Sequence, residues 1–230
     1  MQRNNTKRTI VVFFLIFIPL ILITTGSLLA ADALQIAIDF SGQTNGEGVP
    51  APWDLSVKKG KPFLNIISEN GDRLLHLKST KSSFALEREV AVDVHQYPNL
   101  TWTWKALSIP LNGDIRKKDA NDQALQLILA FKGDRVLSYI WDSNAPDGTV
   151  VDEKLFWPMN LKIKVMVVMS GASDLGKWFT ITRNVFEDYR NLFNETPSPL
   201  VGVRIQMNTQ HTGGNAEGLF KGIFFSRKIL

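Results

Sequence analysis

Residues Leu100-Thr101-Trp102-Thr103-Trp104-Lys105 alternate strictly between apolar and polar side chains. Successive side chains of a β-strand point to opposite faces of a sheet, so Leu100, Trp102 and Trp104 are expected to share one buried face. The threonines and the lysine then lie on the other face. The stretch predicts a half-buried strand that places two of the chain's six tryptophans in the core.

The same pattern recurs along the chain and predicts strands over residues 34–40, 63–67, 74–78, 84–94, 100–106, 124–131, 136–141, 163–169, 178–183, 201–207 and 219–226. Turn-forming residues lie between these segments, and Lys132-Gly133-Asp134 predicts a hairpin. Residues 41–53, rich in glycine and proline, are expected to form a loop. Short strands at regular spacing, without long helices between them, predict an all-β fold of antiparallel sheets packed as a sandwich.

Residues 184–193 depart from this pattern. Their apolar positions have helical spacing: Val185, Tyr189, Leu192 and Phe193. Asn184 followed by Glu187 resembles a capping box, and Pro197 prevents the helix from continuing far. We expect one short helix across an end of the sandwich.

Residues 1–30 are predicted to be a secretory signal peptide. Arg3, Lys7 and Arg8 precede an apolar run over 10–23, and small residues follow it, with cleavage expected after Ala30 or Ala33. The alternative is an uncleaved membrane anchor over 9–31. Cleavage is favoured because the apolar run itself is shorter than the ~20 residues that a span prefers. Residues 31–230 would then form a single exported domain, periplasmic or extracellular.

Composition excludes several classes of function. The chain has no cysteine, which rules out a disulfide scaffold, thiol catalysis and thiolate metal sites. Of its 26 basic residues three lie in the leader, so 23 basic and 22 acidic residues leave the mature domain with a net charge of +1. A nearly neutral domain gives no electrostatic reason to expect a nucleic-acid partner. No other segment is a membrane candidate, so no membrane partner is expected after cleavage.

Acidic residues gather in the predicted loops between 114 and 152, and Asp114 and Asp122 are the candidate metal ligands. Carboxylates on flexible loops suit calcium, the candidate cofactor. They also suit the paired acids of a glycosidase. The alternative is that aspartate favours turns because its side chain bonds the local backbone.

Aromatic residues indicate a possible ligand. Tyr139 and Trp141 lie next to Asp142, and Trp141 and Trp178 are near strand ends, where we expect exposure. Aromatic rings flanked by polar groups bind the apolar faces of sugar rings and their hydroxyls. For Trp102 and Trp104, core packing is the favoured interpretation.

Arg183 immediately precedes the predicted helix and can pair with Asp188. Such a pair would fasten the helix to the sheet, which we favour, or line a polar pocket. Both residues are therefore included among the candidate ligand-binding residues.

Several motifs together resemble a family of exported bacterial proteins known as domain of unknown function 3047. They are residues 100–105, Gly113-Asp114-Ile115-Arg116, Asn121-Asp122, Leu137-Ser138-Tyr139-Ile140-Trp141-Asp142, Ser170-Gly171, Arg183-Asn184-Val185, Asp188-Tyr189-Arg190 with Phe193, Gly202-Val203, Asn208-Thr209 and residues 220–225. The chain departs from the family pattern at Asn121-Asp122 and Asn208-Thr209-Gln210, where acids are usual, which puts a metal site in doubt. The resemblance implies a jelly-roll sandwich of the carbohydrate-binding-module kind and no established activity.

Three functional hypotheses follow. The leading one is a non-catalytic module that binds a glycan or another envelope polymer through Tyr139, Trp141, Asp142, Trp178, Arg183 and Asp188. The second is a hydrolase that uses two of Asp114, Asp122, Asp142 and Asp188. The third is a structural or assembly protein of the cell envelope, which predicts a flat apolar patch in place of a cleft.

Overall fold

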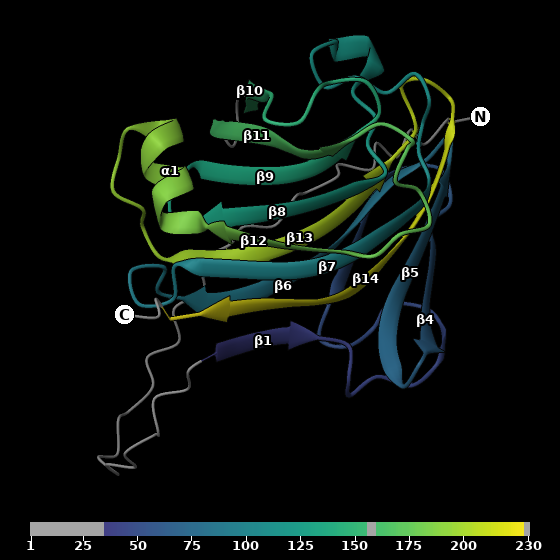
Figure 1. Cartoon of the computed structure of the whole chain (residues 1–230), viewed down its shortest axis with the longest axis horizontal. Coiled ribbons are helices and arrows are strands. Elements are labelled where there is room, and N and C mark those ends of the chain that lie inside the picture. The colour runs from purple at the N-terminus through teal and green to yellow at the C-terminus, as the bar shows by residue number, and fades with distance from the viewer. Residues whose placement is uncertain (1–34, 156–159, 228–230) are drawn as a thin grey trace, which may run out of the picture. The chain divides into compact units, whose positions relative to one another are not determined.

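The computed structural model describes residues 35–155 and 160–227, which belong to one compact unit, Ala33–Leu230 (Figure 1). The predicted leader, residues 1–30, lies outside the described residues. Two seven-stranded sheets, called sheet A and sheet B, pack against each other. Among the described helices, none is both long and apolar enough to cross a membrane.

Sheet A has the C-terminal strand near its centre. Its order is β12 (Phe179–Asn184), β7 (Asn99–Ser108), β14 (Asn215–Ser226), β5 (Asp72–Thr80), β4 (Phe63–Glu69) and β2 (Gly46–Glu47). β14 changes partner along one side: residues 215–220 pair with β5, and residues 222–226 pair with β1 (Gln35–Asp39). In Figure 1, β4 and β5 run steeply across β7 and β14.

Sheet B contains the other long strands. Its order is β10 (Val150–Leu155), β11 (Leu161–Ser170), β9 (Arg135–Asp142), β8 (Leu125–Phe131), β13 (Leu200–Asn208), β6 (Ser83–Val92) and β3 (Asp54–Lys59). Every pair is antiparallel except β9 with β11, which is parallel. A short 3₁₀ helix, η1 (Lys118–Ala120), lies in the connection before β8.

The predicted all-β sandwich is confirmed, with three corrections. β3 and β10, both at sheet edges, were not expected because at least half of the residues in each are polar. β2 falls within the predicted loop 41–53 and has only two residues. The parallel pair β9–β11 departs from the expected antiparallel order; β10 folds back on β11 and lies outside it.

Aromatic rings join the two sheets in the core. Trp102 of sheet A stacks on Tyr139 of sheet B with ring centroids 5.1 Å apart. Trp104 contacts Trp141 at 6.4 Å and Phe220 at 5.7 Å. These five residues are fully buried, as the alternation predicted for Trp102 and Trp104. Aromatic pairs of this kind add about 0.5–1.5 kcal/mol each beyond the burial of their area.

The predicted helix is α1 (Val185–Phe193), at one end of the sandwich (Figure 1). Its cap is the one expected: the side chain of Asn184 accepts a hydrogen bond from the Glu187 backbone N–H at 3.0 Å. The helix ends at Asn194, whose left-handed conformation (φ 55°) stops it before the prolines are reached.

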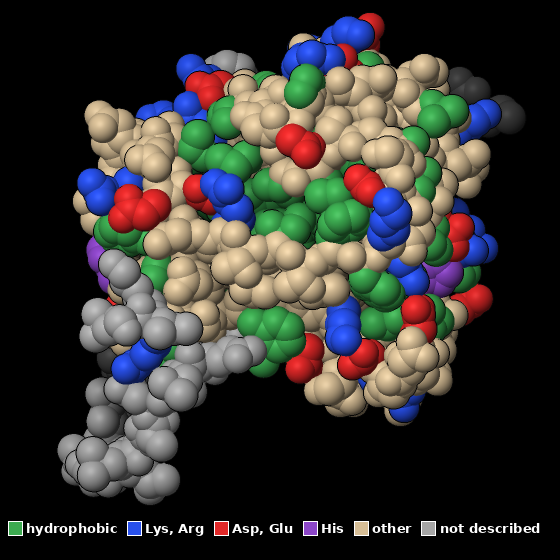
Figure 2. Space-filling view, viewed as in Figure 1, with side chains coloured by type: hydrophobic (Ala, Val, Ile, Leu, Met, Phe, Trp, Pro, Cys, Tyr) green, Lys and Arg blue, Asp and Glu red, His purple; other side chains and the backbone are tan. Residues whose placement is uncertain are grey.

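Apolar side chains reach the surface on one side of the molecule. Figure 2 shows them gathered in a shallow hollow across the middle of the face, with charged groups around it. The partly buried residues that β11, β12 and α1 add to the core are Met166, Val168, Met169, Phe179, Ile181, Leu192 and Phe193. The core is therefore incompletely covered by these three elements.

Candidate functional site: a polar hollow around Trp178

Tyr139 and Trp141 lie in the core, where neither ring is accessible. Both are 0% exposed, so the expected exposure of Trp141 is wrong. Its position near a strand end was misleading because the Gly171 carbonyl accepts from its indole N–H at 3.0 Å and the ring of Phe179 packs edge-on at 5.8 Å. Neither residue can stack on a ligand without rearrangement of the core.

Arg183, Asp188 and Tyr139 form one network, in which Asp188 and Tyr139 are buried and Arg183 is partly exposed. The Tyr139 hydroxyl donates to Asp188 Oδ2 at 2.7 Å, and Arg183 Nε donates to the same oxygen at 2.8 Å. Asp188 is 7% exposed, and burial raises the pKa of Tyr139 well above its usual value. The predicted Arg183–Asp188 pair is confirmed. It ties α1 to β12 and, through Tyr139, to β9, which is the bracing role that the sequence favoured.

Asp142 accepts hydrogen bonds from the backbone of two loops. Asp142 is fully buried and accepts from the N–H groups of Ile115, Asn144 and Ala145 at 2.7–2.9 Å. These bonds shape the loops that cover one end of sheet B. Asp142 therefore has the structural role expected of aspartate in turns.

Asp114 and Asp122 are also bonded internally. Arg116 donates to Asp114 from Nε at 2.8 Å and holds the pKa of that carboxyl well below its usual range. Asp122 accepts from the backbone N–H and the hydroxyl of Thr212, both at 2.7 Å. In the described part of the chain, no three histidine or acidic side chains converge as a metal site would need. A calcium role for this pair stays a prediction, and the ion would have to displace these donors.

The four aspartates proposed for a hydrolase share this behaviour. Each is buried and accepts hydrogen bonds from its own surroundings. Glu153, on β10, differs from them: burial raises its pKa, and Asn121 Nδ2 donates to it at 2.5 Å. Glu153 is not among the acidic residues that the sequence pattern indicated.

A hollow surrounds Trp178 on the outer face of sheet A. It has a volume of about 410 Å³ and is lined by Glu69, Asn70, Asp72, Leu74, Thr103, Trp178, Thr180 and Lys221. We call it the Trp178 hollow. It lies where the tip of the β4–β5 hairpin comes close to β7, β12 and β14. Trp178 is the one predicted ligand-binding residue that lines it.

The hairpin tip is shaped by Asn70 and Gly71, which lie between β4 and β5. Both have positive φ, 53° and 88°, which is the conformation of a two-residue hairpin turn and one that asparagine and glycine tolerate. Glu69 and Asp72 pair across this turn. The turn thus presents two carboxylates side by side at the hollow.

A cation, a carboxylate and an indole meet on one side of the hollow. Lys105 Nζ lies 4.4 Å from the centroid of the Trp178 ring and 3.2 Å from Glu69 Oε1. The indole N–H of Trp178 points to the same carboxylate oxygen at 3.4 Å. The hydrogen bond from Lys105 lowers the pKa of Glu69, although burial opposes it. Glu69 is therefore an ionised acceptor at neutral pH.

The other side of the hollow is also polar. Lys221 pairs with Asp72 at 2.5 Å, and the hydroxyls of Thr103 and Thr180 lie 2.8 Å apart. Either threonine can be the donor, so one hydroxyl hydrogen can turn to another acceptor. The hollow combines one partly exposed aromatic ring, two carboxylates, two ammonium groups and two hydroxyls.

Sequence reasoning missed most of these partners because they come from distant segments. Glu69 and Lys105 are 36 positions apart, and Trp178 is 109 positions from Glu69. The available signals were the Asn-Gly turn and the polar face of residues 101–105. Neither signal indicates that the β4–β5 hairpin tip and the polar face of β7 lie next to each other.

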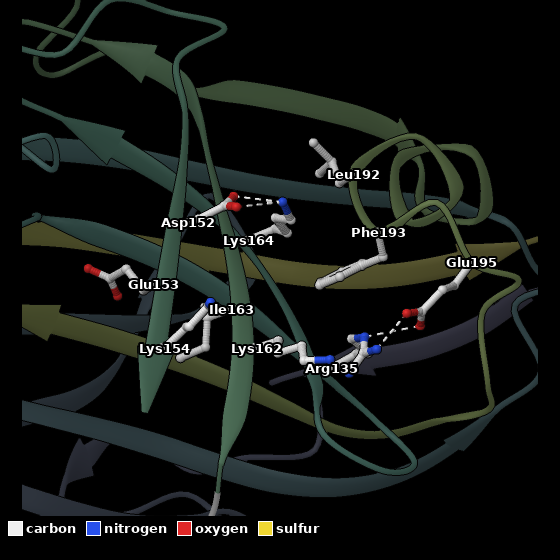
Figure 3. A pocket seen from close by; sticks show the side chains of 10 residues that line it. All are labelled: Arg135, Asp152, Glu153, Lys154, Lys162, Ile163, Lys164, Leu192, Phe193 and Glu195. Carbon is white, nitrogen blue, oxygen red and sulfur yellow. Dashed lines mark hydrogen bonds and ion pairs between the residues drawn. The ribbon is translucent and has the colours of Figure 1, made fainter. Parts of the chain in front are cut away.

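A smaller hollow lies between the edge strands of sheet B and the end of α1 (Figure 3). Its volume is about 220 Å³, below the roughly 300–1,000 Å³ of most ligand pockets. Asp152 pairs with Lys164 and Glu195 with Arg135 across it, as the dashed lines in Figure 3 show. Unlike the Trp178 hollow, this one has no tryptophan or tyrosine ring among its lining residues.

Comparison with protein families identifies the chain. Residues 52–224 match the family described as protein of unknown function (DUF3047). The chain belongs to this family. The match spans the sandwich from β3 to β14 and confirms the resemblance seen in the motifs. Comparison with curated proteins finds no match.

Among solved structures, the fold is similar to several β-proteins at low sequence identity. A family 12 xyloglucanase from Bacillus licheniformis has a TM-score of 0.48 at 7% identity, covering 84% of this chain and 100% of that one. An endoglucanase from Rhodothermus marinus has 0.46 at 9%, covering 80% and 99%. An adhesin domain of Lys-gingipain from Porphyromonas gingivalis has 0.42 at 9%, covering 86% and 100%.

Proposed function

We propose that this protein is a non-catalytic binding module whose ligand is a glycan held in the Trp178 hollow. The observation that carries the proposal is a partly exposed indole between carboxylate and hydroxyl groups, in a hollow of about 410 Å³. Pockets of this size hold small ligands, and their few polar groups set orientation.

The chemistry of the hollow matches that of a sugar ring. The C–H face of a pyranose packs on an aromatic ring, while its hydroxyls both donate and accept hydrogen bonds. Glu69 and Asp72 can accept from hydroxyls, and Lys221 and the threonines can donate. Lys105 holds one face of the indole at 4.4 Å, so a sugar would use the remaining exposed part of the ring.

The proposed site of action is the periplasm or the outside of the cell. This part of the proposal is supported by the basic, apolar and small-residue pattern of residues 1–30. Envelope polymers would be the glycans available there. Signal cleavage is checked by the N-terminal sequence of protein recovered from a bacterial host.

Tryptophan fluorescence and isothermal calorimetry test the binding. Wild-type protein is titrated with cellohexaose, xylohexaose and N-acetylchitohexaose, beside Trp178→Ala. We expect one of these probes to bind, with affinity reduced at least about tenfold in the variant, because stacking on the ring is lost.

Phe186→Ala is the matched control. Phe186 is also partly exposed and carries a cation, Arg190, 5.7 Å from its ring centroid, but it lies on α1. This variant should bind like wild type. Equal affinity of wild type and Trp178→Ala for every probe that binds, or no binding by any probe, contradicts the proposal.

A hydrolase is the second candidate function, favoured by the raised pKa of Glu153. A carboxyl that keeps its proton at higher pH is suited to act as a general acid. This role is tested by release of reducing ends from the same three oligosaccharides. Release that disappears in Glu153→Gln supports it, and no release by wild type contradicts it.

A further inference from the structure

The outer face of sheet A continues beyond the Trp178 hollow as two rows of residues across β12, β7, β14 and β1. One row is Thr180, Thr103, Gly222 and Asp39, and the next is Thr182, Thr101, Phe224 and Ala37. The residues that alternate with them along the strands, such as Trp102 and Ile223, pack in the core, so both rows lie on the outer face. We call the surface formed by the four threonines and Phe224 the threonine face.

The hydroxyls of the threonine face form two pairs. Those of Thr101 and Thr182 lie 2.8 Å apart, as do those of Thr103 and Thr180. Thr180 and Thr182 are exposed and the other two are partly exposed, so a ligand can reach both pairs. Each pair uses one hydroxyl hydrogen internally, which leaves the second hydrogen and several lone pairs for a ligand. The face therefore offers uncharged donors and acceptors side by side.

Phe224 adds a second accessible aromatic ring to this side of the molecule. It is partly exposed, and its ring lies over Gly222, where an added Cβ would be 3.0 Å from two of the ring carbons. Any larger residue at position 222 would push the ring away, so glycine makes room for it on the sheet. Ala37, directly opposite on β1, has only a methyl group beside the ring.

Trp178 and Phe224 lie at the two ends of a diagonal across the sheet. Trp178 immediately precedes β12 and lies over Lys105 on β7, whereas Phe224 on β14 is level with Thr101. Four residues along the strands and two strand spacings across them amount to roughly 16 Å, which is longer than one sugar unit. Thr103 lies midway along the diagonal and also lines the hollow. A saccharide chain that reaches from ring to ring therefore passes between the two hydroxyl pairs.

The charges on this side favour an uncharged ligand. The carboxylates of the hollow are already paired, Glu69 with Lys105 and Asp72 with Lys221. The carboxylate of Asp39, at the end of one row, would repel an acidic sugar. In Figure 2 the surface over β12 and β7 is mainly uncharged. An acidic polymer would find no free cation on the threonine face itself, since its residues are threonine and phenylalanine.

We infer that the Trp178 hollow is one end of a longer site, and that a neutral polysaccharide lies along the threonine face from Trp178 to Phe224. This inference rests on the proposed function, because it extends the same site. It specifies the ligand as an uncharged glycan that is bound over several sugar units within its chain. A single sugar would fill the hollow alone.

Chain length and Phe224 test the extension. The hexasaccharide that binds wild-type protein is compared by calorimetry with its own disaccharide. We expect the hexasaccharide to bind at least about tenfold more tightly, because one chain then engages both rings. Phe224→Ala should lower hexasaccharide affinity at least about threefold, the weight of one aromatic contact. It should leave disaccharide affinity unchanged, since the hollow provides it.

Two further variants separate the ring from the fold. Phe224→Tyr keeps a ring and should bind the hexasaccharide like wild type. Phe224→Leu keeps an apolar group over Gly222 without a ring and should bind like Phe224→Ala. Urea midpoints show that each variant is folded, and Phe224→Leu decides the result if Phe224→Ala does not fold. Phe186→Ala is the matched control, because its partly exposed ring lies on α1, and it should bind like wild type.

Trp178→Ala distinguishes failure of the extension from failure of the proposed function. If this variant binds every probe like wild type, or no probe binds wild type, the proposed function and the extension are both contradicted. If Trp178→Ala is impaired while the ringless variants at position 224 bind the hexasaccharide like wild type, only the extension is overturned. Equal affinity of wild type for the hexasaccharide and the disaccharide also overturns the extension alone.

Salt and ligand charge test the ligand class. Affinity for the neutral hexasaccharide should change by less than about twofold between about 50 and about 500 mM sodium chloride, because binding forms no ion pair. Hexagalacturonate, an acidic hexasaccharide, should not compete with it. Tighter binding of hexagalacturonate than of every neutral probe contradicts the assignment to neutral glycans.

Discussion

Two groups in this molecule are built from the same chemical parts. Tyr139, Arg183 and Asp188 combine an aromatic ring, a cation and a carboxylate in the interior, and Trp178, Lys105 and Glu69 combine the same three on the outer face of sheet A. The carboxylate side chain is 10% exposed in the first group and 36% exposed in the second, whereas the side chain of the cation is 36% exposed in the first and 11% in the second. The first group fastens α1 to the sheets, and the second borders the Trp178 hollow.

The difference lies in burial and in hydrogen-bond saturation. Asp188 receives short bonds from the Tyr139 hydroxyl and from two nitrogens of Arg183. Glu69 receives longer ones, at 3.2–3.4 Å, from Lys105 and Trp178. A group that is buried and saturated contributes to stability, whereas an exposed and loosely bonded group is free to exchange partners with a ligand.

The largest expected effect is on stability and comes from the buried carboxylate. Asp188→Ala should lower the free energy of unfolding by roughly 2–3 kcal/mol, because the buried Tyr139 hydroxyl and Arg183 lose their shared partner. Glu69→Ala should cost less than about 1 kcal/mol, since its pair is partly solvated. Urea unfolding followed by circular dichroism measures both. Similar losses in the two variants would remove the distinction between the groups.

A smaller effect is expected when only the polar tip of each ring is removed. Tyr139→Phe should cost about 1 kcal/mol, the usual weight of a buried hydrogen bond when its acceptor keeps another donor. Trp178→Phe should change stability by less than about 0.5 kcal/mol because its bond to Glu69 is long, at 3.4 Å, and only partly buried. The same urea series compares the two variants. A larger loss of stability for Trp178→Phe than for Tyr139→Phe would mean that the Trp178 group, and not the Tyr139 group, stabilises the fold.

The smallest effect is in the pH dependence of stability. The pKa of Glu69 is lowered from 4.5, so its pair stabilises the fold above that pH and the contribution is lost as pH falls below it. Glu153 has the opposite sign: its pKa is raised from 4.5, so stability falls as pH rises above 4.5 and stays lower at neutral pH.

Glu69→Gln should therefore flatten the curve on the acid side of 4.5, and Glu153→Gln should flatten it above 4.5 and raise stability at neutral pH. Unfolding measured from about pH 3 to about pH 7 tests both signs. A Glu153→Gln variant that is less stable than wild type at neutral pH would contradict this sign. It would show that hydrogen bonds to the ionised carboxylate outweigh the cost of burying its charge.

The fold could be predicted from the sequence because burial repeats every second residue. Residues 100–105 are a clear instance, since the alternation of Trp102 and Trp104 with threonine matched the observed strand and its buried face. The cap at Asn184 and the Asn70-Gly71 turn were equally local. The residues that form the cap and the turn are within a few positions of each other in the chain, so both features can be recognised in a single sequence.

The candidate site was less predictable because its causes are not local. Trp141 and Trp178 both lie near strand ends, yet one is fully buried and the other is partly exposed. What covers Trp141 is the chain around Gly171 and Phe179, and what surrounds Trp178 is a hairpin tip about a hundred positions away. The number of aspartates in the loops suggested a metal or catalytic site. In the structure, Asp142 and Asp122 are buried and accept hydrogen bonds from backbone N–H groups, which is a structural role.

The position of β14 has a consequence for how the domain closes. This strand comes after the other described strands, yet it lies between β7 and β5 and also pairs with β1, the first of them. The strands on its two sides are therefore joined into one sheet only when residues 215–226 are in place between them.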